Sequence, residues 1–275
     1  MKFLKRVFDF YINSSIHVAL AVCCLTWITL LEFDQKINFN VLLFIFFATV
    51  TGYNFVKYFG LAKFHHRSLA TWLKYIQVFS FFCFIGLAYF TFKLNINTLY
   101  VLGGLGIITL LYAIPFLPKK YFLDQGKNLR AIGGLKIYVI AFVWAITTVI
   151  IPLIELVFPI TNDVLITTIQ RFIYVLVVML PFEIRDMRYD SLKLATIPQR
   201  IGIRKTKTIG AILAVQMLVL ELFKDELIVQ QFVVLFVIVI LTIIVLFQSN
   251  VNQKAYFSSF WVEGIPILWL VLSLF

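Results

Sequence analysis

Long apolar segments recur along the whole chain and alternate with short polar stretches. Nine such segments cover approximately residues 16–31, 39–56, 75–92, 98–117, 133–158, 164–182, 208–223, 228–247 and 259–275. A helix needs roughly 20 apolar residues to cross the hydrocarbon core of a bilayer. A membrane β-barrel would instead show shorter segments of alternating polarity. The pattern therefore predicts an all-α, polytopic membrane protein with nine transmembrane helices.

The composition agrees with this pattern. Hydrophobic residues make up 62% of the chain and charged residues 13%, whereas a soluble domain is about half apolar and about one quarter charged. Nothing marks a second domain or a long linker, so we expect residues 1–275 to form a single integral-membrane domain. The three cysteines, Cys23, Cys24 and Cys83, lie inside apolar segments, which indicates small buried side chains rather than a redox or metal site.

The basic residues mark one side of the predicted membrane. Of the 24 lysine and arginine residues, all but Lys36, Lys93, Arg171 and Lys224 fall at the N-terminus or in alternate loops. The positive-inside rule places these regions in the cytoplasm, with the C-terminus outside. The net charge of +11 then acts as an orientation signal with contacts to anionic lipid. We expect a multi-pass protein of the cell membrane that binds no nucleic acid.

A run of charge follows the sixth apolar segment. Asp186 and Asp190 are four residues apart and share a helical face with Glu183. Carboxylates on one stripe repel one another unless a cation neutralises them, and Mg²⁺ prefers hard oxygen ligands that it shares with substrate phosphates. The alternative is a solvated helix end whose aspartates pair with Arg185 and Arg188. The spacing alone leaves both interpretations open.

Two stretches contain motif residues that resemble the UbiA-type superfamily of membrane prenyltransferases. The first reads R-D-x-x-x-D, then T-x-P and R-x-G, and here consists of Arg185, Asp186, Asp190, Thr196, Pro198, Arg200 and Gly202. The second joins the fourth and fifth segments and contains Tyr112, Pro115, Lys119, Lys120, Lys127, Asn128, Leu129 and Lys136. The resemblance implies a nine-helix bundle around a central cavity that faces the cytoplasm.

The resemblance also implies a chemistry. Such enzymes transfer an isoprenyl group from a polyprenyl diphosphate to an aromatic or lipophilic acceptor, with Mg²⁺ and basic side chains stabilising the diphosphate as it leaves. The aspartates implied as catalytic Mg²⁺ ligands are Asp186 and Asp190. The candidate diphosphate contacts are Asn54, Lys57, Lys119, Arg130, Arg200 and Lys205.

The chain departs from the family in its first motif, which reads N-x-x-x-D and often continues with a further x-x-x-D. Asn54 is present, but Tyr58 and Ala62 occupy the two aspartate positions. Three explanations remain open. In the first, the site works with one aspartate pair and with Lys57 or Lys63 as fixed cations. In the second, catalysis is lost while an isoprenoid or a protein partner is still bound. In the third, other residues rebuild the motif.

One arginine lies inside an apolar segment. Arg171 follows Gln170 within the sixth segment, and charged residues at such depth usually face the bundle interior or a cavity. Glu155 and Glu221 are its candidate partners. Both a structural ion pair and a substrate contact remain possible roles.

Overall fold

The computed structural model describes residues 2–64, 71–113, 134–188, 195–254 and 256–275, and within these ranges it contains helices and no strands. The elements are α1 (Lys2–Asn13), α2 (Ile16–Glu32), α3 (Phe39–Phe64), α4 (Thr71–Thr91), α5 (Ile96–Ala113), α6 (Leu135–Ala145), η3 (Ile146–Ile150), α7 (Ile151–Glu155), α8 (Asn162–Asp186), α9 (Ile197–Ile201), α10 (Ile203–Glu221), α11 (Val229–Gln248), η5 (Phe257–Val262) and α12 (Ile265–Ser273). The segments η3 and η5 are π-helical.

Each predicted apolar segment coincides with helical residues, which confirms the all-helical membrane fold. Five helices in the described ranges are long and apolar enough to cross a membrane: α3, α4, the continuous α6–η3–α7, α8 and α11. A sixth span results if the bent pair α1–α2 counts as one. The apolar parts of α5 and of η5–α12 are shorter. The structure thus gives a multi-pass membrane protein with five to six spans by length and composition, where the sequence predicted nine.

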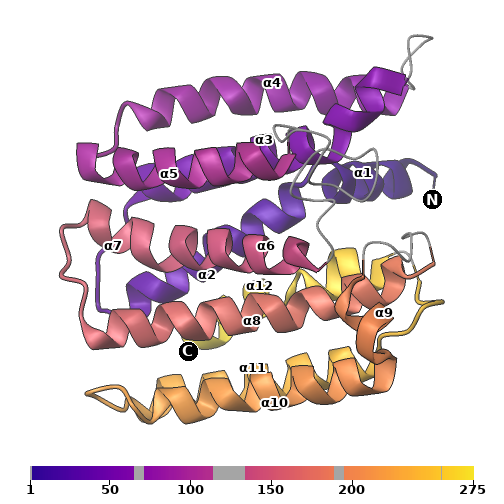
Figure 1. Ribbon diagram of the computed structural model, residues 1–275. Coiled ribbons are helices and arrows are strands. Elements are labelled where there is room, and N and C mark those ends of the chain that lie inside the picture. Colours follow the sequence, from indigo (N-terminus) through magenta and orange to yellow (C-terminus); the bar gives the residue numbers. More distant parts are fainter. Residues whose placement is uncertain (1, 65–70, 114–133, 189–194, 255) are drawn as a thin grey trace, which may run out of the picture.

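The long helices lie side by side and alternate in direction (Figure 1). The carboxyl ends of α3, α5, α8 and α11 lie at the same end of the bundle as α1 and α9. The turn between α10 and α11 lies at the opposite end. Alternate connections therefore meet at one end. This end, which we call the polar end, contains the carboxyl terminus of α8 and thus Asp186.

The helix α8 forms the centre of the core. Of its apolar window, 67% is buried inside the protein, against 17% for α4. Side chains such as Tyr174, Val177 and Ile184 are buried among residues of α2, α6, α10 and α11. By contrast, Phe81 and Phe82 of α4 are exposed, as expected for a helix whose outer face contacts lipid tails. The position of α8 in the core fixes the place of its polar end.

The first two helices meet at a sharp bend. Ser15 adopts a left-handed backbone conformation (φ 64°), and α1 departs from the axis of α2 by 54°. The Ser15 hydroxyl donates a hydrogen bond to the Asn54 side-chain oxygen at 2.8 Å. The bend, which we call the Ser14–Ser15 hinge, is thereby fixed to α3.

Candidate functional site at the polar end of the bundle

Asp186 ends α8 between two cations. Arg185 donates to its Oδ1 through Nε and Nη2, each at 2.8 Å, and the Lys136 Nζ lies 3.7 Å from its Oδ2. The Asp186 side chain is 22% exposed, so solvent reaches it. Because Lys136 starts α6, this cluster joins two core helices through opposite charges. Asp190 falls outside the described residues.

Glu183, the third carboxylate of the predicted stripe, is buried and serves the neighbouring helix. Its Oε2 accepts a hydrogen bond from the backbone N–H of Ile197 at 3.3 Å. Ile197 is the first residue of α9, where a negative charge is favourable because the first N–H groups of a helix lack partners within it. Glu183 therefore positions α9 and does not face the same surroundings as Asp186.

The polar motif after α8 has a clear local structure. Thr196 and Gln199 form a capping box at the start of α9, and Pro198 lies in its first turn, where a missing N–H costs nothing. Gly202 ends the helix at φ 83° and ψ 157°, a conformation nearly restricted to glycine. Of the motif residues that the structure describes, Arg200 and Gly202 are exposed. The Arg200 side chain is therefore open to solvent.

The basic residues of α10 divide into two kinds. Lys205 is exposed. Lys207 is partly buried, and its Nζ donates to the carbonyl oxygen of Phe247 at 2.7 Å, near the end of α11. Burial lowers the pKa of the Lys207 ammonium. Lys205 is thus available to a ligand, whereas Lys207 caps a helix. Lys119 and Arg130, the other two predicted diphosphate contacts, lie outside the described residues.

The residues at the predicted first motif, Asn54 and Tyr58, form hydrogen bonds to neighbouring helices. Asn54 is buried, and besides accepting from Ser15 it donates to the carbonyl oxygen of Ser14 at 3.0 Å and to the Ser80 hydroxyl at 2.8 Å. Its amide therefore joins α3 to the Ser14–Ser15 hinge and to α4. Tyr58 donates to the carbonyl oxygen of Asn13 at 2.8 Å.

Lys57 lies in the same segment of α3 as Asn54 and Tyr58. Its side chain is exposed, and its Nζ lies 3.4 Å from the carbonyl oxygen of Asn13. It also interacts electrostatically with Arg185 and with Glu263. Lys57 therefore lies near enough to Arg185 to feel its positive charge, and Arg185 in turn pairs with Asp186.

The described residues hold only part of a metal site. Among them, no group of three or more histidine, cysteine, aspartate or glutamate side chains could bind a metal ion. Asp186 alone faces the cluster as a carboxylate of the predicted pair, and it is neutralised by Arg185 and Lys136. In this part of the chain, positive side chains rather than a carboxylate cage dominate the site.

The chain resembles a solved structure in overall fold. This structure was described in work on the biosynthesis of digeranylgeranylglyceryl phosphate synthase in membranes. The two superpose with a TM-score of 0.58, at 16% sequence identity, over 99% of each chain. Neither a protein-family model nor a curated protein matches the sequence. At this identity the likeness concerns the fold, and it extends over essentially the entire bundle.

Sequence reasoning missed Glu263, which lies at the junction of η5 and α12. It is partly buried and interacts electrostatically with Lys57 and Arg185. The signal was present, because Glu263 is a lone carboxylate in an apolar run, and ionisable residues in such runs often mark functional sites. The cluster thus also contains a carboxyl group from the junction of η5 and α12, and burial raises the pKa of that group to about 8.

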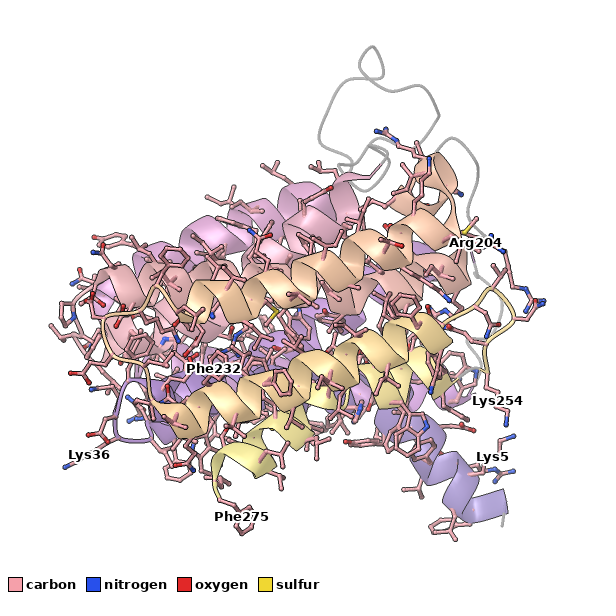
Figure 2. The ribbon with its side chains drawn as sticks, turned by 90° about the horizontal axis from the view of Figure 1, so that it is seen from below. Lys5, Lys36, Arg204, Phe232, Lys254 and Phe275 are labelled. Carbon is pink, nitrogen blue, oxygen red and sulfur yellow. The ribbon has the colours of Figure 1, made fainter. Side chains whose placement is uncertain are left out.

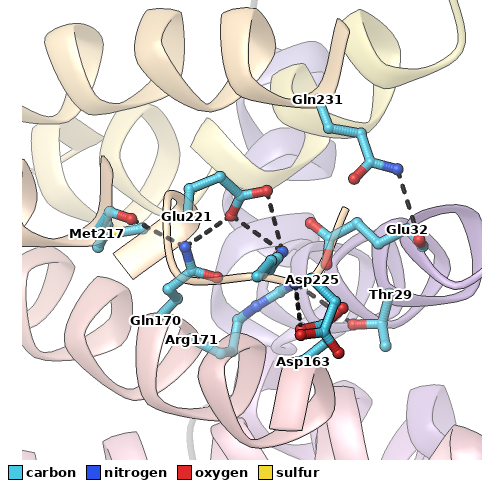
Figure 3. A network of polar contacts seen from close by, with 10 residues as sticks. Thr29, Glu32, Asp163, Gln170, Arg171, Met217, Glu221, Asp225 and Gln231 are labelled. Atoms are coloured by element: carbon cyan, nitrogen blue, oxygen red, sulfur yellow. Dashed lines mark hydrogen bonds and ion pairs between the residues drawn. The ribbon is translucent and has the colours of Figure 1, made fainter. Parts of the chain in front are cut away.

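The buried Arg171 belongs to a different network (Figure 3). Its guanidinium donates to the Leu25 carbonyl oxygen at 3.0 Å and to the Thr29 hydroxyl at 3.4 Å, and it lies 5.1 Å from the Trp269 ring centroid. Glu32 supplies the neighbouring negative charge. Arg171 therefore ties α8 to α2 and α12.

The two predicted partners of Arg171 were wrong. Glu221 accepts from Gln170 at 2.7 Å and pairs with Lys224 at 2.9 Å. Glu155 accepts from the Asn95 backbone N–H at 2.9 Å. Glu221 and Glu155 thus each accept hydrogen bonds from residues near the end of their own helix, whereas Arg171 donates across the core to α2.

Proposed function

We propose that this protein is a membrane prenyltransferase that moves an isoprenyl group from a polyprenyl diphosphate to a lipophilic or aromatic acceptor. The observation that carries the proposal is the fold match over 99% of both chains to a structure from work on a membrane digeranylgeranylglyceryl phosphate synthase. The motif residues from Arg185 to Gly202 and the cations at the polar end support it independently.

The residues of the polar end suit the departure of a diphosphate. In the transfer, the bond between the allylic carbon and the diphosphate oxygen breaks, and its electron pair leaves with the diphosphate. Lys57, Lys136 and Arg185 would stabilise that charge, as fixed cations do in a partly desolvated site. The allylic carbon then bonds to a nucleophilic atom of the acceptor, which loses a proton to water.

The proposal assigns Mg²⁺ to Asp186 and Asp190. Their spacing of one helical turn supports it, and the bound metal would supply further charge stabilisation to the leaving diphosphate. Arg200 and Lys205, both exposed beside α8, together with Lys119 and Arg130, would draw the diphosphate to this end. The isoprenyl chain would extend among the apolar helices toward the bilayer.

The experiment uses purified full-length protein in lipid vesicles with labelled geranylgeranyl or farnesyl diphosphate. We expect diphosphate release and a labelled lipid product in the presence of Mg²⁺, and loss of both with a chelator. The double variant Asp186→Ala and Asp190→Ala should lose at least about a hundredfold in turnover. The matched control is Asp225→Asn, which changes an exposed acid in the turn between α10 and α11, at the opposite end of the bundle (Figure 1).

Two outcomes would contradict the proposal. Turnover that survives in the double variant would remove the metal assignment. Saturable binding of the diphosphate without turnover, in protein that remains folded, would assign the chain to isoprenoid binding without catalysis.

A further inference from the structure

The first helix, α1, has two sharply different faces. At 100° per residue, Lys5, Arg6, Asp9 and Asn13 fall on one narrow arc of the helix. The remaining arc is entirely apolar or aromatic and is formed by Phe3, Leu4, Val7, Phe8, Phe10, Tyr11 and Ile12. Such a division is typical of a helix that lies where water and hydrocarbon meet.

The second half of the apolar face is already packed against the bundle. The Phe8 ring lies 5.1 Å from the Tyr256 ring and 5.2 Å from the Phe260 ring. The Phe10 ring lies 5.7 Å from that of Phe79 in α4. The Tyr256 hydroxyl also donates to Asp9. These contacts hold the end of α1 between α4 and η5.

Among the described residues, no such ring contact is made by the residues of α1 before Phe8. Phe3 is 76% exposed, Leu4 73% and Val7 51%. Figure 2 shows α1 extending away from the other helices, with Lys5 near its outer end and Lys254 near its base. Lys5 and Arg6 are exposed as well. The exposed apolar side chains therefore lie beside exposed positive charges, an arrangement that suits neither the hydrocarbon core nor bulk water.

The geometry of the next helix shows that α1 is not required for crossing the membrane. α2 contains 17 residues and rises about 26 Å, close to the roughly 30 Å of a hydrocarbon core. The 54° bend at the Ser14–Ser15 hinge turns α1 away from that path. A helix that leaves the axis of a span at its end, with a basic face and an apolar face, meets the headgroup layer.

We propose that α1 docks on anionic lipid headgroups at the polar end of the bundle. Phe3, Leu4 and Val7 enter the boundary between headgroups and acyl chains, while Lys5 and Arg6 contact lipid phosphates. Lys254 adds a third positive charge at the same surface. Charge complementarity selects anionic lipid as the partner, because each basic residue near an anionic membrane surface adds to binding.

The test places a nitroxide label on Leu4→Cys in full-length protein whose three native cysteines are replaced by alanine. The protein is reconstituted into vesicles of phosphatidylcholine, alone or mixed with phosphatidylglycerol. Collision rates with oxygen and with a neutral, water-soluble nickel chelate report depth. We expect the label to meet oxygen and to be shielded from nickel in the anionic vesicles, and to lose that shielding in the neutral ones.

The charge variant is Arg6→Glu, with Lys36→Glu as its matched control. Lys36 is also exposed and lies at the opposite end of the bundle (Figure 2). Arg6→Glu should weaken docking about fivefold for each unit of charge changed, while Lys36→Glu should leave docking unaltered. Equal shielding of the label in both lipid mixtures overturns the proposal. Shielding that instead rises with protein density, whatever the lipid, assigns the surface to a second copy of the chain and also overturns it.

Discussion

The Tyr58 hydroxyl donates a 2.8 Å hydrogen bond to the carbonyl oxygen of Asn13, the last residue of α1. In the family that the chain resembles, an aspartate occupies this position of the first motif. Here the position joins α3 to the first helix, and Tyr58 is packed against Leu73 and Ile76 of α4. Tyr58 thus holds three helices together.

The neighbouring Asn54 should behave as a structural residue. Asn54→Ala removes two hydrogen bonds at the Ser14–Ser15 hinge and one to Ser80 of α4, and it leaves the Ser14 carbonyl unpaired in a buried site. We expect a loss of about 2–3 kcal/mol in stability, measured as a lower thermal midpoint in detergent. Asn252→Ala, at an exposed position, is the control. A stable Asn54→Ala protein that no longer binds diphosphate would instead make Asn54 a ligand.

Removal of the Glu263 carboxylate should strengthen diphosphate binding in alkaline solution. Burial raises the pKa of Glu263 to about 8, so the ionised carboxylate competes with an anionic ligand for Lys57 and Arg185 only above that pH. In Glu263→Gln we expect the KM for the diphosphate to fall by about fivefold at pH ~9, the equivalent of ~1 kcal/mol at a partly exposed site, and to change little at pH ~7. Glu263→Asp, which retains the charge, should change KM little. A higher KM in Glu263→Gln would show that the carboxylate assists binding.

Arg171 should contribute to stability and not to turnover. Arg171→Met removes the bonds to Leu25 and Thr29 and leaves Glu32 without its neighbouring positive charge. Breaking a buried charged network typically costs about 3–5 kcal/mol, so we expect a clearly lower thermal midpoint. At a temperature where the variant is folded, kcat should be near that of the parent protein. A selective loss of kcat would assign Arg171 to the substrate.

The attachment of α1 to Tyr256 should weaken at alkaline pH. The hydrogen bond to Asp9 raises the pKa of Tyr256 above its ordinary value, which is about 10. A raised pKa in the folded state means that the stabilisation is fully present below pH ~10 and is lost as the pH rises through the folded pKa. A mobility probe on α1 should therefore detect loosening on that alkaline limb. Tyr256→Phe should lack the transition, and an identical transition in both proteins would exclude this pair as its cause.

The lengths of the apolar segments predicted the helices well, because a membrane span depends on the side chains of one local segment. The starts of α2, α3 and α11 fell within a residue of those expected. The roles of polar residues were predicted less well, since they depend on distant partners. Asn54 was predicted to contact a diphosphate, whereas its hydrogen bonds go to the Ser14–Ser15 hinge, about 40 residues earlier, and to Ser80 of α4.

The partner of Arg171 shows the same limit. Opposite charge suggested Glu155 and Glu221, but α2 packs against α8 at the depth of Arg171 and offers a carbonyl, a hydroxyl and Glu32 there. Charge pairing in a sequence does not indicate which helices are neighbours. Within the described residues, five to six helices have the length and composition of a full crossing.

The π-helical turn η3 changes the helical register within the continuous helix α6–η3–α7. A π turn accommodates one extra residue without breaking the helix, so η3 sets the angular offset between the two halves of α6–η3–α7. One half presents Lys136 to Asp186, and the other presents Glu155 to Asn95. One local turn thus determines which faces the two ends of the same helix present, and deleting one residue from η3 should misalign one of these two contacts.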